Sequence, residues 1–117
     1  MEVQIEAHET TTIFHMEGRL DLAGAEVVEQ NLQQLETQRI QHSTVIISFH
    51  DVHYISSSGL RVIVAAFNHV DEHGGKMILC GMDIGVMEVF EFAGLTDVFD
   101  IVESLPEAKK QVGLPVL

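Results

Sequence analysis

Cysteine, proline and basic side chains are scarce in this chain of 117 residues. The one cysteine, Cys80, cannot form an internal disulfide, which fits a reducing compartment. Only two prolines accompany a hydrophobic content of 46%, a composition typical of a globular chain rather than a disordered one. The length suffices for one hydrophobic core but not for two, so we expect a single domain spanning residues 1–117.

Long hydrophobic runs and export signals are also missing. The longest stretch without a polar residue, Val62 to Phe67, is far shorter than the ~20 residues that cross a membrane. Met1-Glu2-Val3-Gln4 lacks the basic and apolar pattern of a signal peptide. We therefore expect a cytoplasmic protein without membrane insertion.

Positive charge is rare, since 6 basic side chains stand against 18 acidic ones and the formal net charge is −12. Only Lys109 and Lys110 are adjacent, whereas binding the phosphates of a nucleic acid requires clustered basic residues. No direct nucleic-acid contact is expected. An acidic surface favours partners with basic patches, because it speeds their encounter. The alternative is that the charge only keeps the protein soluble.

The apolar pattern predicts an α/β fold with a mixed sheet of four or five strands and crossover helices. Alternating or continuous apolar stretches predict strands at residues 2–6, 12–16, 45–49, 77–80 and 98–102. Apolar stripes at helical spacing predict helices that begin near Asp21, Ser57, Asp83 and Leu105. After the first hairpin, helices and strands alternate, which implies parallel strands. In such sheets functional residues tend to lie beyond the carboxyl ends of the strands.

Three consecutive serines, Ser56 to Ser58, lie where the buried strand at 45–49 gives way to a helix. A serine there is a natural N-cap, because its oxygen accepts hydrogen bonds from free backbone N–H groups. Those N–H groups and the helix dipole also suit a phosphate. Gly59 inside the first turn costs roughly 1 kcal/mol relative to alanine, which a surface approaching the backbone would explain. The position is therefore a candidate switch, with an ordinary helix cap as the alternative.

The segment from Asp51 to Leu60 resembles the phosphorylation loop of the STAS domain family, which includes bacterial anti-sigma factor antagonists. Glu17-Gly18-Arg19-Leu20-Asp21 is similar to a second family motif, and residues 74–81 followed by 89–95 are similar to a third. Aligned on the glycine of that loop, the family's phospho-acceptor falls on Ser57, with Ser58 and Ser56 as rivals. Many phosphorylated antagonists carry aspartate before the acceptor, and this chain carries Ser56 instead.

The resemblance implies an anti-sigma factor antagonist with a STAS-like, SpoIIAA-like fold. It would dock an anti-sigma factor that is also a serine kinase, lose that binding once Ser57 is phosphorylated, and regain it through a PP2C-type serine phosphatase. The oxygen of Ser57 would stand over the unpaired amides of the helix. The partner-binding residues expected on this basis are Asp21, Tyr54, Ser56, Ser57, Ser58, Gly59 and Arg61.

Asp21 has two readings. Beside Ser57 it would accept a hydrogen bond from the free hydroxyl and repel a phosphate added there. Alternatively it is a first-turn or N-cap carboxylate of the helix that follows it.

Other residues point away from catalysis. No G-x-S-x-G elbow, glycine-rich phosphate loop or catalytic dyad is present, so neither an enzyme nor a cofactor is expected. The pairs His50/His53 and His69/His73 fit solvated histidines better than a metal site, and Cys80 fits an inert core thiol. Three apolar residues of the helix after Asp83, namely Val86, Val89 and Phe92, could lie on its outer face and form a docking surface, although such residues more often simply pack.

Two other functions stay open. The chain could be a permanently bound STAS subunit of a larger assembly, such as a lipid-transport ATPase or a stress-signalling scaffold, in which the serines cap the helix without turnover. It could also carry a small ligand at the anion-friendly start of the helix.

Overall fold

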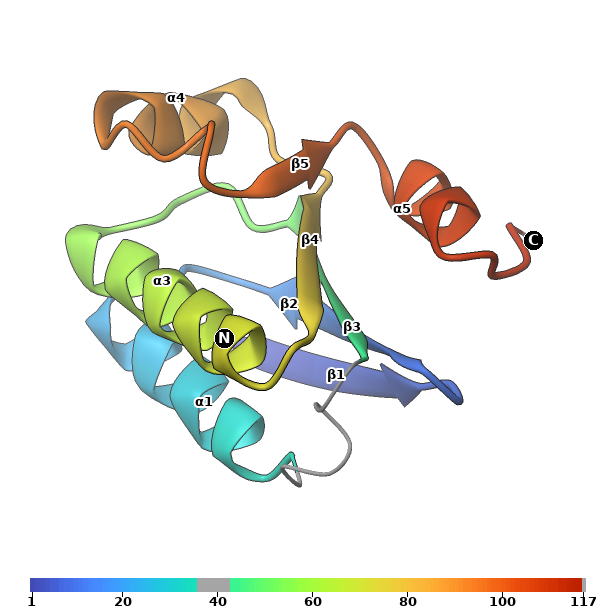
Figure 1. Cartoon of the computed structure of the whole chain (residues 1–117). Coiled ribbons are helices and arrows are strands. Elements are labelled where there is room, and N and C mark those ends of the chain that lie inside the picture. Colours follow the sequence, from blue (N-terminus) through green and yellow to red (C-terminus); the bar gives the residue numbers. More distant parts are fainter. Residues whose placement is uncertain (36–42, 117) are drawn as a thin grey trace.

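The computed structural model describes residues 1–35 and 43–116 as one mixed sheet with helices on both faces (Figure 1). Its elements, in chain order, are β1 (Glu2–Ala7), β2 (Thr11–Glu17), α1 (Leu22–Gln33), β3 (Thr44–Asp51), α3 (Ser57–Glu72), β4 (Lys76–Cys80), α4 (Ile84–Phe92), β5 (Asp100–Val102) and α5 (Leu105–Gln111). The five strands stand in the order β1-β2-β3-β4-β5. Only β1 runs antiparallel to its neighbour, so the predicted mixed α/β sheet is confirmed.

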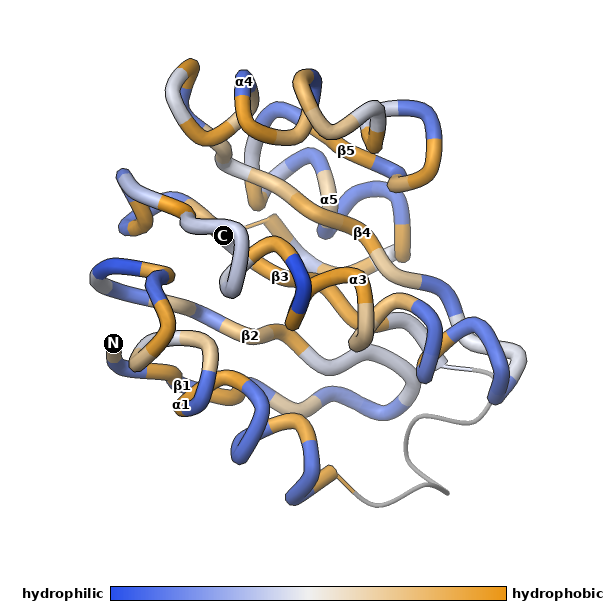
Figure 2. The backbone as a smooth tube through the Cα atoms, turned by 90° about the vertical axis from the view of Figure 1, so that its left-hand side faces the viewer, coloured by the Kyte–Doolittle hydropathy of each residue, from blue (hydrophilic) through white to orange (hydrophobic). Residues whose placement is uncertain are grey.

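The central strands are apolar because both of their faces are covered. Five consecutive residues of β3, from Val45 to Phe49, are buried, which explains their continuous rather than alternating hydrophobic pattern. Figure 2 shows β3 and β4 as largely hydrophobic segments, whereas α1 alternates between hydrophilic and hydrophobic residues. Burial also raises the pKa of the Cys80 thiol, which lies on β4, to about 11.

Two separate cores lie on the two faces of the sheet. The larger one packs side chains of α1, α3 and α4 against the sheet and includes Phe14, Val28, Ile63 and Phe90. The smaller one lies under α5, where Ala108 meets Ile13, Ile46, Ile78 and Cys80. Figure 1 shows α1 and α3 side by side and α5 on the opposite side of the sheet. No helix in the described ranges is long and apolar enough to cross a membrane.

Two of the three apolar residues considered for an outer face of α4 pack inward, which is the alternative that such residues more often follow. Val86 is buried and Val89 is partly buried, because both point towards the core with Phe90. The Phe90 ring packs edge-on against the ring of Phe49, with 6.0 Å between the centroids. Phe92 falls outside this i, i+3, i+4 stripe and is 91% exposed.

Candidate functional site

The loops after β2 and β3 are hydrogen-bonded to each other at the carboxyl edge of the sheet. Leu20 and Ile55 form an isolated parallel bridge. The Leu20 N–H donates to the Tyr54 carbonyl at 3.0 Å, and the Ser56 N–H donates to the Leu20 carbonyl at 3.0 Å. Each loop leads directly into a helix, so the bridge sets the start of α1 beside the start of α3.

Ser56, not Ser57, caps α3. Its backbone is extended, and its Oγ accepts from the Gly59 N–H at 3.2 Å. The same hydroxyl donates to the Leu20 carbonyl at 3.3 Å, so both its oxygen and its proton are engaged. The expectation that the Ser57 oxygen stands over the unpaired amides is therefore wrong, because Ser57 is already the first helical residue.

The other two serines differ in accessibility. Ser57 is exposed, and its hydroxyl makes no hydrogen bond within residues 1–35 and 43–116. Ser58 is half-buried. Of the three hydroxyls, that of Ser57 is thus both accessible and uncommitted.

Gly59 is required by packing within the chain. A Cβ at this position would lie 2.3 Å from the Leu20 carbonyl oxygen and 2.8 Å from the Leu20 Cγ. The surface that approaches the glycine backbone is thus the chain's own loop after β2, and Gly59 is buried beneath it. If Gly59 has a role in partner binding, that role is indirect, because the glycine sets the position of the serines.

Asp21 is the N-cap of α1, the second of its two readings. Its Oδ1 accepts from the Gly24 N–H at 2.9 Å, and its Oδ2 lies 3.7 Å from Nε of Arg19. The Gly24 hydrogen bond, together with the Arg19 guanidinium, holds the pKa of the Asp21 carboxyl below its usual value. Among the described residues Asp21 makes no hydrogen bond with Ser57, so the first reading does not describe this conformation.

Arg19 was missed by the sequence reasoning although it lies within the quoted Gly18–Asp21 motif. Its guanidinium carbon lies 4.0 Å from the centroid of the Tyr54 ring, a cation–π contact that joins the two loops a second time. Gly18 makes the approach possible with a φ of 121°, and its N–H donates to the Asp51 carbonyl at 3.1 Å.

The loop after β4 joins the same edge through histidine. His53 Nδ1 lies 2.9 Å from Oδ2 of Asp83, whose Oδ1 accepts from the Val86 N–H and so caps α4, the helix expected to begin near Asp83. The Val86 N–H and then His53 hold the pKa of Asp83 below its usual value. In residues 1–35 and 43–116 no three His, Cys, Asp or Glu side chains are grouped to hold a metal ion.

Three large hydrophobic side chains are exposed at this edge. Leu22 is the first residue of α1 and is 65% exposed, and Ile84 is the first residue of α4 and is 79% exposed. Tyr54, between them in the chain, is 42% exposed. Together with Ser57 they form what we call the edge surface: Leu22, Tyr54, Ser57 and Ile84. An exposed apolar set around an accessible hydroxyl is suited to protein docking.

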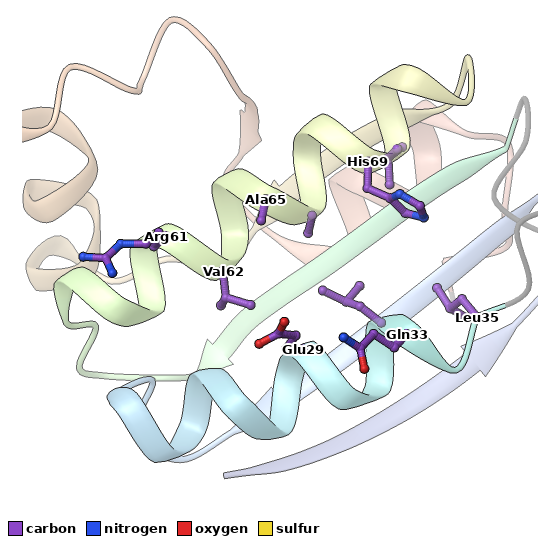
Figure 3. A pocket seen from close by; sticks show the side chains of 10 residues that line it. Glu29, Gln33, Leu35, Arg61, Val62, Ala65 and His69 are labelled. Carbon is purple, nitrogen blue, oxygen red and sulfur yellow. The ribbon is translucent and has the colours of Figure 1, made fainter.

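Arg61 lies one turn into α3, beside a groove between α1 and α3 of about 540 Å³ (Figure 3). The groove is lined mainly by apolar residues such as Leu32 and Val62, with Glu29 on the opposite helix. Arg61 is exposed and makes no ion pair or hydrogen bond with any described residue.

Comparison with known proteins identifies the fold and the family. The model of the STAS domain matches residues 2–108, and the chain belongs to that family. It is 30% identical over 106 residues to the anti-sigma-B factor antagonist of Listeria monocytogenes, with 86% of this chain and 90% of the relative covered. It is 24% identical over 104 residues to the anti-sigma F factor antagonist of Paenibacillus polymyxa, with 89% and 88% covered.

Solved structures agree on the fold. An anti-sigma factor antagonist from Mycobacterium paratuberculosis superposes with a TM-score of 0.82 at 18% identity, with 96% of this chain and 93% of that chain covered. The Bacillus cell fate determinant SpoIIAA in its phosphorylated form superposes with a TM-score of 0.73 at 22% identity, with 95% and 99% covered. The curated relatives are thus named for antagonism of anti-sigma factors, which is a binding role.

Proposed function

We propose that this protein is an anti-sigma factor antagonist whose binding is switched off by phosphorylation of Ser57. The observation that carries the proposal is the accessible, uncommitted hydroxyl of Ser57 within the edge surface. Unphosphorylated, the edge surface docks an anti-sigma factor that is also a serine kinase, which releases the sigma factor. The full-length matches to antagonists of two sigma factor systems support this role.

Phosphorylation opposes docking for an electrostatic reason. A phosphoserine carries about −1.5 to −2 charges at pH 7, and here it would lie at the same edge of the sheet as the exposed apolar side chains of Leu22, Tyr54 and Ile84. Burying those side chains against a partner would also strip water from the phosphate. A loss of ~3 kcal/mol in binding would reduce the affinity roughly a hundredfold, enough to reverse partner choice.

Geometry favours Ser57 over both rivals as the acceptor. A phosphate on Ser56 would remove the hydroxyl proton that donates to the Leu20 carbonyl and would place negative charge beside that carbonyl oxygen. Ser58 is half-buried and so less open to a kinase. The Ser56 hydroxyl stands where many phosphorylated antagonists carry a carboxylate, so here the serine before the acceptor has a structural task.

The protein acts, in this proposal, as a binding module in the cytoplasm and not as an enzyme. The kinase supplies ATP and the transfer machinery, and a PP2C-type serine phosphatase restores the hydroxyl. The edge surface contributes shape, apolar contact and the acceptor oxygen.

The test uses the purified anti-sigma kinase of the same organism with ATP. Mass spectrometry should locate one phosphate on Ser57, and Ser57→Ala should abolish the modification while Ser58→Ala should keep it. Calorimetry should show that Ser57→Asp weakens binding at least tenfold, with Ser57→Thr as the control that keeps a hydroxyl. Phosphate on another residue, or an unchanged affinity of Ser57→Asp, would refute the proposal that phosphorylation of Ser57 switches binding off.

One observation favours a second candidate, a non-switching STAS subunit of a lipid-transport ATPase or a stress-signalling scaffold. Ser56 replaces the aspartate of many phosphorylated antagonists and is fully used as a cap. In that case a tagged protein purified from its own cells would carry a transporter ATPase or scaffold subunits instead of a kinase. Ser57→Asp would then leave assembly unchanged.

A further inference from the structure

Within residues 1–35 and 43–116 Arg61 has no acidic partner, although the chain carries three times as many acidic as basic side chains. Two other cations of the described residues are paired, Arg19 with Asp21 and Lys76 with Asp100 at 3.4 Å. The helix around Arg61 offers no such partner. Side chains three or four positions away are its neighbours on a helix, and at Arg61 these are Ser57, Ser58, Val64 and Ala65.

The direction of the side chain points to the start of the helix. Side chains of an α-helix tilt towards its N-terminus, so a residue covers the turn before its own. Figure 3 shows the Arg61 guanidinium at the N-terminal end of α3, turned outward and away from Glu29 across the groove. The side chain that stands four residues before it is Ser57, which is exposed like Arg61 itself.

We propose that Arg61 binds the phosphate of phosphorylated Ser57 and is thereby withdrawn from the surface that a partner contacts. This inference rests on the proposed function and deepens it. An acidic group four residues before a basic one is the favourable order for an ion pair on a helix. The planar guanidinium also offers two N–H groups to two phosphate oxygens, which a lysine cannot do.

The competing charges at this edge are already engaged. The Asp21 carboxylate is held by the Gly24 N–H and by Arg19, and Arg19 itself is stacked on Tyr54. Arg61 is therefore the cation near Ser57 that is free to move to a new anion. Phosphorylation then has two effects, because it adds negative charge to the edge surface at Ser57 and pairs Arg61, which would otherwise be available to a partner's carboxylate.

The inference can be tested without any kinase by incorporating phosphoserine at position 57 during translation of the full chain. Phosphorus NMR at a series of pH values then reports the second ionisation of the phosphate, near pH 6 for an unperturbed group. Arg61 favours the dianion, so Arg61→Gln should raise the phosphate pKa. A pair of ~0.3 kcal/mol corresponds to ~0.2 of a pKa unit, which sets the smallest shift expected.

Matched variants keep the test specific. Arg61→Lys should retain part of the shift, and Lys110→Gln, which removes an exposed charge from α5, should leave the phosphate pKa unchanged. The other ionisable groups at this edge, Arg19, Asp21 and His53, are the same in every sample. In the wild type, phosphorylation should also move the Arg61 Nε–H resonance downfield.

Equal phosphate pKa values for Arg61→Gln and Lys110→Gln, with an unmoved Arg61 resonance, would overturn the inference. That outcome is distinct from failure of the proposed function, because the phosphoserine is incorporated during translation and neither a kinase nor a binding partner is present. Conversely, a kinase that does not phosphorylate Ser57 would refute the proposed phosphorylation switch and would not affect the NMR result.

Discussion

The starts of α1 and α3 share one local design and differ in chemistry at two positions, the cap and the first helical residue. Each begins with a cap whose side chain accepts from the N–H of a glycine three residues later, Asp21 with Gly24 and Ser56 with Gly59. Each glycine lies under a backbone carbonyl. A Cβ added to Gly24 would lie 2.2 Å from the Arg19 carbonyl oxygen, and one added to Gly59 would lie 2.3 Å from the Leu20 carbonyl oxygen. The caps differ in charge, and the first helical residues differ in chemistry.

That difference separates scaffold from function. The cap and the glycine hold both helix starts against the sheet edge, so they are needed whatever the protein binds. The first helical residue projects outward in both cases, as apolar Leu22 in α1 and as the hydroxyl of Ser57 in α3. The switch is thus proposed to reside in the one position of the shared design that packing leaves free.

The largest expected effect is on the glycines. Gly59→Ala should lower the free energy of unfolding by about 2–3 kcal/mol, because the new methyl group must displace the Leu20 backbone. Gly24→Ala should behave alike, since its Cβ would meet the Arg19 carbonyl. Urea unfolding measures both. Gly85→Ala is the matched control, because its Cβ would have 3.6 Å to its nearest neighbour, and it should be neutral or stabilising by up to about 1 kcal/mol.

The next effect concerns binding. The double variant Leu22→Ala/Ile84→Ala should weaken docking of the anti-sigma kinase at least about tenfold, ~1.4 kcal/mol, since it removes exposed contact area beside Ser57. Calorimetry measures the affinity. Phe92→Ala removes an equally exposed hydrophobic group from the other end of α4 and should leave binding unchanged. Equal losses in both proteins would mean that the edge surface is not the docking site.

Loss of a cap should matter less than loss of a glycine. Ser56→Ala should cost about 1 kcal/mol of stability, because the Gly59 N–H loses its acceptor. Ser57→Ala should stay within about 0.5 kcal/mol of the wild type, since its hydroxyl is exposed and uncommitted. Thermal and urea unfolding give the order, and a reversed order would contradict the assignment of the cap.

The smallest effect is a difference in pH dependence between the two helix starts. The pKa of Asp21 is lowered in the folded state, so its contribution to stability is present above the unfolded value of 3.8 and is lost as the pH falls through the folded pKa. Asp21→Asn should therefore be less stable than the wild type at pH 7, with the gap closing below about pH 4. Urea midpoints at pH 7 and pH 3 measure it. Ser56→Asn should show no such closing gap, because a serine cap does not titrate.

Much of the scaffold was readable from residues that are adjacent in the chain. Local patterns account for the buried run from Val45 to Phe49, for the caps Asp21 and Asp83, and for the glycine after the serines. Helical spacing left the outer face of α4 open, because Val86, Val89 and Phe92 could each lie on it or pack inward. Which of these residues packs inward depends on Phe49 of β3, which packs against Phe90 of α4.

The sequence by itself determined the alternation of strands and helices and put an accessible serine segment after the third strand. Periodicity and capping depend on neighbours within a turn or two, so they are legible without a structure. The tertiary structure decided that the Ser56 hydroxyl donates to the Leu20 carbonyl, that Gly59 packs beneath Leu20, and that Arg19 stacks on Tyr54. These contacts join residues more than thirty positions apart, and the parallel pairing of β2 with β3 brings the loops that carry them together.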